Sequence, residues 1–204
     1  GERGRTKEAQ DPQNHLGTVI RLQENGKVPQ DNPFLKNRKG RAEIFSYGHR
    51  NPQGMALHPK TGKIWVHEHG PQGGDEINIL KAGANYGWPK TTFGEQYGGG
   101  KIGIGPKSPG IEEPLLHWTP SIAPSGMDFY QGDIFPNWNG DLLVGSLKFR
   151  MLVRVDLEGS LVQGQEVVFQ DRIGRVRDVR VSPEGKVYLL NDEYRGGIFR
   201  LDPL

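Results

Sequence analysis

The sequence contains no cysteine, which excludes disulfide bonds and thiolate chemistry. It has no apolar run near the ~20 residues that a membrane span needs, and its first residues do not form a charged-then-apolar leader. Basic and acidic residues number 26 and 24 and are interspersed, so no block of positive charge indicates nucleic-acid or membrane-surface binding. We therefore expect a globular protein with no membrane span and no nucleic-acid partner.

Several enzyme signatures are also missing. Ser125 and Ser146 lie outside any Gly-x-Ser-x-Gly elbow, and the chain has no Gly-rich dinucleotide fingerprint or phosphate loop. No segment shows a convincing amphipathic-helix pattern. What the chain does contain is 30 glycines and 15 prolines among 204 residues, which indicates many short elements joined by turns.

Short strands bounded by Gly, Pro or Asn are predicted along the chain. The first five cover residues 17–22, 43–47, 55–57, 63–67 and 76–80. Residues 91–114 are predicted to form one long loop, whose length suggests a function.

An internal repeat appears once the turns are aligned. Residues 55–66 resemble residues 179–190 in the order strand, Pro-containing turn, Gly-Lys, strand, and residues 126–144 contain a looser copy. A third strand candidate follows each copy. A repeated antiparallel meander is typical of β-propeller blades, so we predict an all-β propeller; a β-sandwich is the alternative.

The meander also predicts where a site lies. If the strands of a blade are A to D, the D-to-A and B-to-C connections meet at one end of the sheet. The polar clusters fall in these connections, whereas the turns at 59–62, 135–140 and 183–185 fall at the other end. The predicted cluster comprises Arg50, Asn51, Gln53, residues 69–75, Ser121, Lys148, Arg175, Arg177 and residues 191–195.

The residue types in this cluster indicate its chemistry. Four cations, Arg50, Lys148, Arg175 and Arg177, suit a ligand with several carboxylates or phosphates; solvated surface charges are the alternative. Residues 69–76 form a kinked loop rich in carbonyl and carboxylate oxygens, which hard cations such as Ca²⁺ prefer; a plain turn is the alternative there.

Motifs along nearly the whole chain carry a family resemblance. They are Gly1-Glu-Arg-Gly4, Asp31-Asn-Pro-Phe34, Gly48-His-Arg-Asn-Pro-Gln-Gly54, Glu68-His-Gly-Pro71, Asp75-Glu-Ile-Asn78, Asn85-Tyr-Gly-Trp-Pro89, Ala123-Pro-Ser125, Ser146-Leu-Lys148 and Arg175-Val-Arg-Asp178. On these residues the chain resembles the C-terminal part of soluble pyrroloquinoline-quinone (PQQ)-dependent aldose sugar dehydrogenases of the glucose/sorbosone dehydrogenase-like family. That family forms six-bladed β-propellers.

The resemblance implies two cofactors, PQQ and Ca²⁺. It places PQQ against Arg50, Asn51, Gln53, His69, Asp75, Ser121, Lys148, Arg175 and Arg177. It places one Ca²⁺ on the main-chain carbonyls of Gly70 and Pro71, and a second, structural Ca²⁺ near Glu76 and Tyr86.

The resemblance also implies a reaction: oxidation of an aldose at the anomeric carbon to the lactone, with hydride passing to the quinone and then to an external electron acceptor. Glu2 matches the acid that orients the family's general base, a histidine, and Arg50 matches a further active-site residue. The histidine would lie before residue 1, and none of the six histidines here takes its place.

At roughly 45 residues per blade, 204 residues make three to four blades. Residues 1–204 are therefore predicted to be the C-terminal part of a single propeller domain, periplasmic or secreted by resemblance. A calcium-dependent propeller lactonase and a non-catalytic propeller binding module are the alternative functions.

Overall fold

A computed structural model describes residues 1–2 and 4–203 of the chain. Arg3, in the first motif of the family resemblance, lies outside the described residues. Strands dominate, joined by turns and loops and accompanied by two 3₁₀ helices, η1 (Thr6–Gln10) and η2 (Pro136–Trp138). None of the described helices is long and apolar enough to cross a membrane. The predicted all-β class is confirmed.

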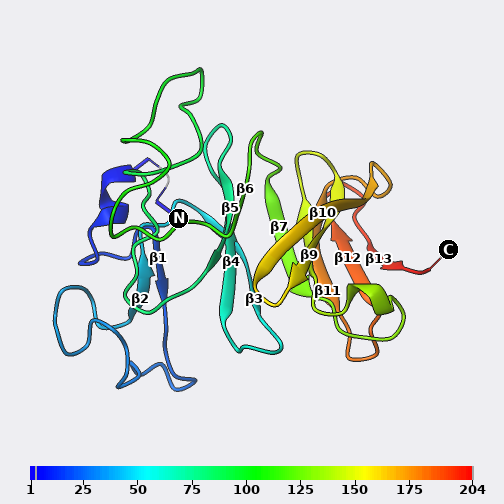
Figure 1. Cartoon of the computed structure of the whole chain (residues 1–204), viewed down its shortest axis with the longest axis horizontal. Helices are drawn as coiled ribbons and strands as arrows, with labels where there is room; N and C mark the ends of the chain where they lie inside the picture. Colours follow the sequence, from blue (N-terminus) through cyan, green and yellow to red (C-terminus); the bar gives the residue numbers. More distant parts are fainter. Residues whose placement is uncertain (3, 204) are drawn as a thin grey trace. The chain divides into compact units, whose positions relative to one another are not determined.

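The strands form four antiparallel sheets (Figure 1), with orders β1-β2, β3-β4-β5-β6, β10-β9-β8-β7 and β11-β12-β13. Their bounds are β1 Thr18–Ile20, β2 Ile44–Tyr47, β3 Pro52–Leu57, β4 Ile64–Glu68, β5 Asp75–Ile79, β6 Leu116–Trp118, β7 Pro124–Phe129, β8 Leu142–Ser146, β9 Met151–Glu158, β10 Leu161–Gln170, β11 Val176–Val181, β12 Val187–Asn191 and β13 Ile198–Leu201. Each larger sheet keeps its strands in chain order, which is the up-and-down meander that the repeat predicts.

Two strands were missed by the sequence analysis. β6 has only three residues and follows the long loop, so it offers little pattern to read. β10 has ten residues, but most are exposed or half-buried and Gly164 interrupts them, which removes the apolar alternation that marks a strand. β10 pairs with β9 through two register shifts.

Internal contacts divide the chain into two compact units, each described by itself. Unit 1 comprises Gly1–Pro52 and Glu68–Pro120, and unit 2 comprises Gln53–His67 and Ser121–Leu204. Whether residues 1–204 belong to one propeller domain stays a prediction.

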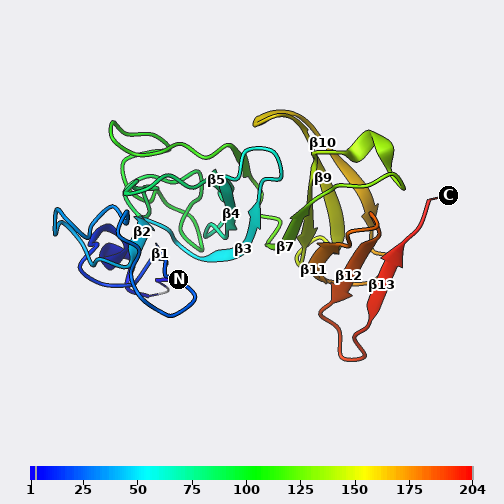
Figure 2. The same cartoon turned by 90° about the horizontal axis from the view of Figure 1, so that it is seen from below.

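Unit 2 has a regular apolar core. One cluster in it comprises Tyr130, Leu143, Leu152, Val176, Val179, Val187 and Leu189, from the β7–β10 and β11–β13 sheets (Figure 2) and, for Tyr130, the residue directly after β7. The Ser125 hydroxyl donates to the Val176 carbonyl at 2.7 Å, and the Val181 amide donates to Asp128 Oδ2 at 2.9 Å. Apolar packing and a few buried polar bonds thus join these two sheets.

Unit 1 is built mainly of loops. Its strands β1 and β2 pair antiparallel, as do β5 and β6. Much of the remaining chain of this unit consists of η1 and the long loop. Polar side chains are buried in it, among them Glu2, His49, Glu68, Asp75 and Asn78. Loops depend on such side chains because their main-chain groups lack a regular ladder of partners.

Candidate active site

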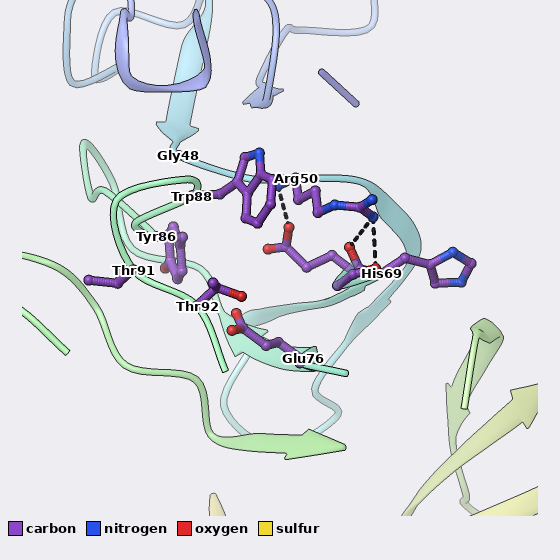
Figure 3. Close-up of a pocket in the computed structure, with 11 residues that line it drawn as sticks. Gly48, Arg50, His69, Glu76, Tyr86, Trp88, Thr91 and Thr92 are labelled. Atoms are coloured by element: carbon purple, nitrogen blue, oxygen red, sulfur yellow. Dashed lines mark hydrogen bonds between the residues drawn. The ribbon is translucent and has the colours of Figure 1, made fainter. Parts of the chain in front are cut away.

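A small, partly open cavity lies among the loops of unit 1, lined by residues that include Arg50, Glu76, Tyr86 and Trp88 (Figure 3). The centre of a water-sized sphere can occupy about 10 Å³ of it. That is room for a single water molecule or metal ion, not for an organic cofactor.

Arg50 joins the two loops that the sequence singled out. Its Nη1 donates to the carbonyls of His69 and Gly70, at 3.0 and 2.8 Å, and its guanidinium lies 5.3 Å from the ring centroid of Trp88. Figure 3 shows these bonds and shows the His69 ring pointing away from Glu76 and Tyr86. Arg50 is therefore fixed by main-chain oxygens and an aromatic face.

Glu68 is a buried residue that bonds to the main chain of Arg50 and to two neighbouring side chains; we call it the polar hub. Its Oε2 accepts from the main-chain amide of Arg50 at 2.5 Å, while its Oε1 lies 2.8 Å from His49 Nδ1 and accepts from Asn78 Nδ2 at 3.2 Å. The Glu68 side chain is 5% exposed and that of His49 is not exposed. Glu68 lies in the Glu68-His-Gly-Pro71 motif, but its role could not be predicted, because a polar motif does not show which of its side chains is buried.

The loop at 69–75 needs glycine. The Gly70 amide donates to Asp75 Oδ1 at 2.8 Å, and a Cβ on Gly70 would lie 2.2 Å from the carbonyl oxygen of Gly73. Only a residue without a side chain permits this close approach. The fold of the loop thus depends on Asp75, for which the resemblance implied a cofactor contact.

Acidic groups accumulate around Glu76. Burial raises its pKa well above the usual range, and the charges of Glu68 and Asp75 raise it further, against the lowering effect of the hydrogen bond from Asn78. Asn78 Nδ2 bridges Glu68 and Glu76, but Asn78 Oδ1 is buried and has no hydrogen-bond partner among the described residues. Such a cluster favours uptake of a cation or a proton.

No three His, Asp or Glu side chains of the described chain are arranged to hold a metal ion. A cation near Glu76 would therefore need main-chain oxygens or water as further ligands.

Tyr86 forms one wall of the cavity. Its hydroxyl donates to the Ile79 carbonyl at 2.7 Å and accepts from the Lys81 amide at 2.9 Å, and its ring stacks on His49 at a centroid distance of 4.6 Å. Burial raises the pKa of Tyr86, so its hydroxyl stays protonated. A metal contact by Tyr86 stays a prediction.

Glu2 lies at the other side of Arg50 and is 3% exposed. Its main-chain amide donates to the Arg50 carbonyl at 3.0 Å, and its Oε1 accepts from Trp88 Nε1 at 2.6 Å. Glu2 Oε2 is buried without a hydrogen-bond partner in the part of the chain that the structure describes. A buried carboxylate oxygen in this state is poised to accept a hydrogen bond.

Of the other predicted cofactor contacts, Asn51 lies in unit 1 and the rest lie in unit 2. Hydrogen bonds to main-chain carbonyls bring their segments together: the Lys148 amide donates to the Ile122 carbonyl at 3.2 Å, and the Ser125 hydroxyl donates to the Val176 carbonyl. Ser121, Lys148, Arg175 and Arg177 therefore lie on neighbouring segments. Gln53 is also in this unit, at the second position of β3.

Two positions differ from the expectation. Gln53 and Arg177 were predicted to precede their strands, but each is the second residue of one, β3 and β11. The alternation signal begins later than the hydrogen-bonded strand does, which explains the error. Arg175 and Asn51 do precede these strands, as predicted.

The cations of unit 2 differ in their partners. Arg175 pairs with Asp192 at 3.0 Å, on the surface. Lys148 and Arg177 are exposed and form no ion pair with any described residue. Two of these cations are thus available to an anionic ligand.

Comparison with known proteins identifies the family. The sequence model of glucose/sorbosone dehydrogenases matches residues 1–200. The chain belongs to the glucose/sorbosone dehydrogenase family. The aldose sugar dehydrogenase YliI of Escherichia coli K12 is 44% identical over 205 residues, covering 100% of this chain and 55% of the relative. The chain thus spans about half the length of this curated relative.

Solved structures of glucose/sorbosone dehydrogenase relatives share the fold. The apo-form of the soluble aldose sugar dehydrogenase of E. coli matches with a TM-score of 0.93 and 43% identity, over 100% of this chain and 59% of that one. The PQQ-bound aldose sugar dehydrogenase of Streptomyces coelicolor matches with a TM-score of 0.78 and 28% identity, over 99% and 56%. The predicted propeller class, with this chain as a part of it, is confirmed.

Proposed function

We propose that the protein to which this chain belongs is a PQQ- and Ca²⁺-dependent aldose sugar dehydrogenase, which oxidises the anomeric carbon of its substrate to the lactone. Family membership supports this proposal, as do the names of the relatives, one an aldose sugar dehydrogenase and one bound to PQQ. The observation that carries it is the position of Glu2 next to Arg50, set by a hydrogen bond from the Glu2 main-chain amide to the Arg50 carbonyl, with a buried side-chain oxygen of Glu2 left to orient a further group.

The cations of the chain suit PQQ, which is a planar tricarboxylate. Lys148 and Arg177 would hold its carboxylates, because they are exposed and lack acidic partners within the described chain. Arg175 would exchange its exposed partner Asp192 for the ligand. Arg50, Asn51, Gln53, His69, Asp75 and Ser121 complete the proposed contact set.

The loop carbonyls suit a calcium ion. Gly70 and Pro71 would hold it through main-chain oxygens, which hard cations accept as ligands. A calcium ion held there would supply Lewis-acid chemistry that makes the quinone a better hydride acceptor. A second, structural Ca²⁺ near Glu76 and Tyr86 would offset the negative charges around Glu76, whose pKa is raised first by burial and then by Glu68 and Asp75.

The residues of the chain would position the proton transfer. Abstraction of the sugar hydroxyl proton needs a general base. By the family resemblance this is a histidine that lies upstream of Glu2, and Glu2 Oε2 would accept a hydrogen bond from its ring. Arg50, held by the carbonyls of His69 and Gly70, would keep a fixed positive charge beside the reacting groups.

Quinone binding by the full-length protein tests this proposal. We expect PQQ to bind only when Ca²⁺ is present, glucose to reduce the bound quinone, and removal of Ca²⁺ with EGTA to stop reduction. Lys148→Ala should weaken PQQ binding by about ten-fold or more, since charge-assisted hydrogen bonds are worth ~1.5–3 kcal/mol.

Lys60→Ala is the matched control, because Lys60 is an exposed lysine of the same unit outside the proposed site. A folded protein that shows no PQQ binding at any Ca²⁺ concentration would overturn the proposal. Ca²⁺-dependent sugar-lactone hydrolysis without quinone affinity would indicate the lactonase instead.

A further inference from the structure

Trp88 contacts both of the residues that the proposed function places nearest the chemistry. Its indole N–H donates to Glu2 Oε1 at 2.6 Å, and its ring face lies 5.3 Å from the guanidinium of Arg50. These contacts use different parts of one side chain: the polar edge for the carboxylate, and the aromatic face for the cation.

Trp88 is itself held rigidly. Its amide donates to the Gly48 carbonyl at 2.8 Å, and its carbonyl accepts from Gln10 Nε2 at 2.7 Å. The side chain is 7% exposed and packs in a cluster with Ala9 and Ile102. Neither its main chain nor its ring can move without breaking buried contacts.

We infer that Trp88 is a positioning residue that fixes the Glu2 carboxylate and the Arg50 guanidinium relative to each other. The inference rests on the proposed function, because that function gives Glu2 and Arg50 their roles. By binding Oε1, the indole leaves Oε2 as the one oxygen of Glu2 free to orient the base.

The hydrogen bond matters because a carboxyl group without it can rotate. Rotation would exchange Oε1 and Oε2, so that the oxygen that accepts the second hydrogen bond would no longer have one fixed position. An orienting residue works only if its acceptor is held in place, since small misplacements of reacting groups lower rates steeply.

A purely structural role for Trp88 predicts a different outcome. If Trp88 only fills the cluster with Ala9 and Ile102, then Trp88→Phe should lower stability and leave turnover per folded molecule unchanged. Phenylalanine keeps an aromatic face for Arg50 and removes the N–H group, so this variant isolates the bond to Glu2.

Steady-state kinetics of the full-length enzyme, loaded with PQQ and Ca²⁺, provide the first test. Trp88→Phe should lower kcat by about ten-fold, the value expected for losing one hydrogen bond to a charged group, and should change KM for glucose and PQQ affinity far less. Unchanged kcat in a folded variant would overturn the inference.

Trp65→Phe is the matched control. Trp65 is fully buried in unit 2, and its Nε1 has no hydrogen-bond partner among the described residues, so loss of its N–H removes no bond. Its kcat should equal that of the wild type. In a Glu2→Ala background, Trp88→Phe should have little further effect on kcat, because both changes break the same interaction.

The indole N–H resonance gives a second readout that needs no activity. In ¹H–¹⁵N spectra the Trp88 peak, assigned by its loss in Trp88→Phe, should lie downfield and exchange slowly. Glu2→Gln, which makes the acceptor neutral, should move it upfield without moving the Trp65 peak. If the chemical shift of the Trp88 indole N–H is the same in Glu2→Gln as in the wild type, the inference is overturned.

The two proposals fail in distinguishable ways. Wild-type protein that never reduces PQQ with sugar overturns the proposed function, and the indole resonance then decides alone whether Trp88 fixes Glu2. Active wild-type protein with an unaffected Trp88→Phe variant overturns only the role of Trp88.

Discussion

The two units are stabilised in opposite ways. Unit 2 buries an apolar cluster between two regular sheets, with members such as Leu143 and Leu152 fully buried. Unit 1 buries Glu2, His49, Glu68, Asp75 and Asn78 among loops. Apolar packing tolerates small changes of shape, whereas a buried polar group requires each partner at hydrogen-bond distance.

This difference explains why the loops of unit 1 can hold their side chains in precise positions. Loops take many conformations unless side chains fix them, and in unit 1 Glu68 and Asp75 bond directly to loop amides. The polar network that fixes the loops is also the weakest point of the unit, because removal of one member leaves other buried groups unsatisfied.

The largest effect is expected at the polar hub. Glu68→Ala removes the acceptor for Arg50 N and the partner of buried His49, and should lower the free energy of unfolding by about 4 kcal/mol. Urea unfolding measures this. Glu24→Ala, an exposed glutamate of the same unit, is the control and should change nothing. An effect below about 1 kcal/mol for Glu68→Ala would contradict the hub role.

A smaller effect is expected in the apolar core of unit 2. Leu143→Ala should cost about 3 kcal/mol through lost burial and the cavity left behind, again measured by urea unfolding. Leu161→Ala, at a position 66% exposed, should be nearly neutral. If Leu143→Ala proved more damaging than Glu68→Ala, the contrast between the units would be reversed.

The smallest effect is expected at a surface pair of unit 1. A main-chain hydrogen bond, and next the bond to His15 at 2.6 Å, lower the pKa of Glu43. A carboxyl with a lowered pKa adds stability above its ordinary value of 4.5 and loses it as the pH falls through the lowered pKa.

Glu43→Gln should therefore lower the free energy of unfolding at pH 7 by less than about 1 kcal/mol, because solvent screens the pair. The melting temperatures of variant and wild type should converge as the pH falls well below 4.5. A difference that persists or grows in acid would show that the carboxylate charge is not the cause.

Much of the regular structure was predictable from local sequence patterns. The repeat of residues 55–66 in 179–190 corresponds to β3–β4 and β11–β12, and the looser copy to β7–β8. The predicted strands in these copies are short runs rich in apolar residues between clear turn signals. The short β6 and the exposed β10 lack such alternation and could not be predicted.

For the site, the segments were predictable but their internal bonding was not. Motifs pointed to Arg50 and to residues 69–76, and the structure joins them through the carbonyls of His69 and Gly70. Glu68 and Trp88 lay in quoted motifs without a role, because the sequence does not show which polar side chain is buried or what it meets. Thr91 and Thr92 of the long loop line the cavity as well, and this position was not predicted from the sequence.

The Gly70 carbonyl has a consequence for how the two proposed cofactors would affect each other's binding. Its oxygen already accepts a hydrogen bond from Arg50 at 2.8 Å. A calcium ion on the same oxygen would lie close to a fixed positive charge, and like charges repel. An anionic quinone would relieve that repulsion, so metal and quinone should each raise the affinity for the other by the same factor, as thermodynamic linkage requires.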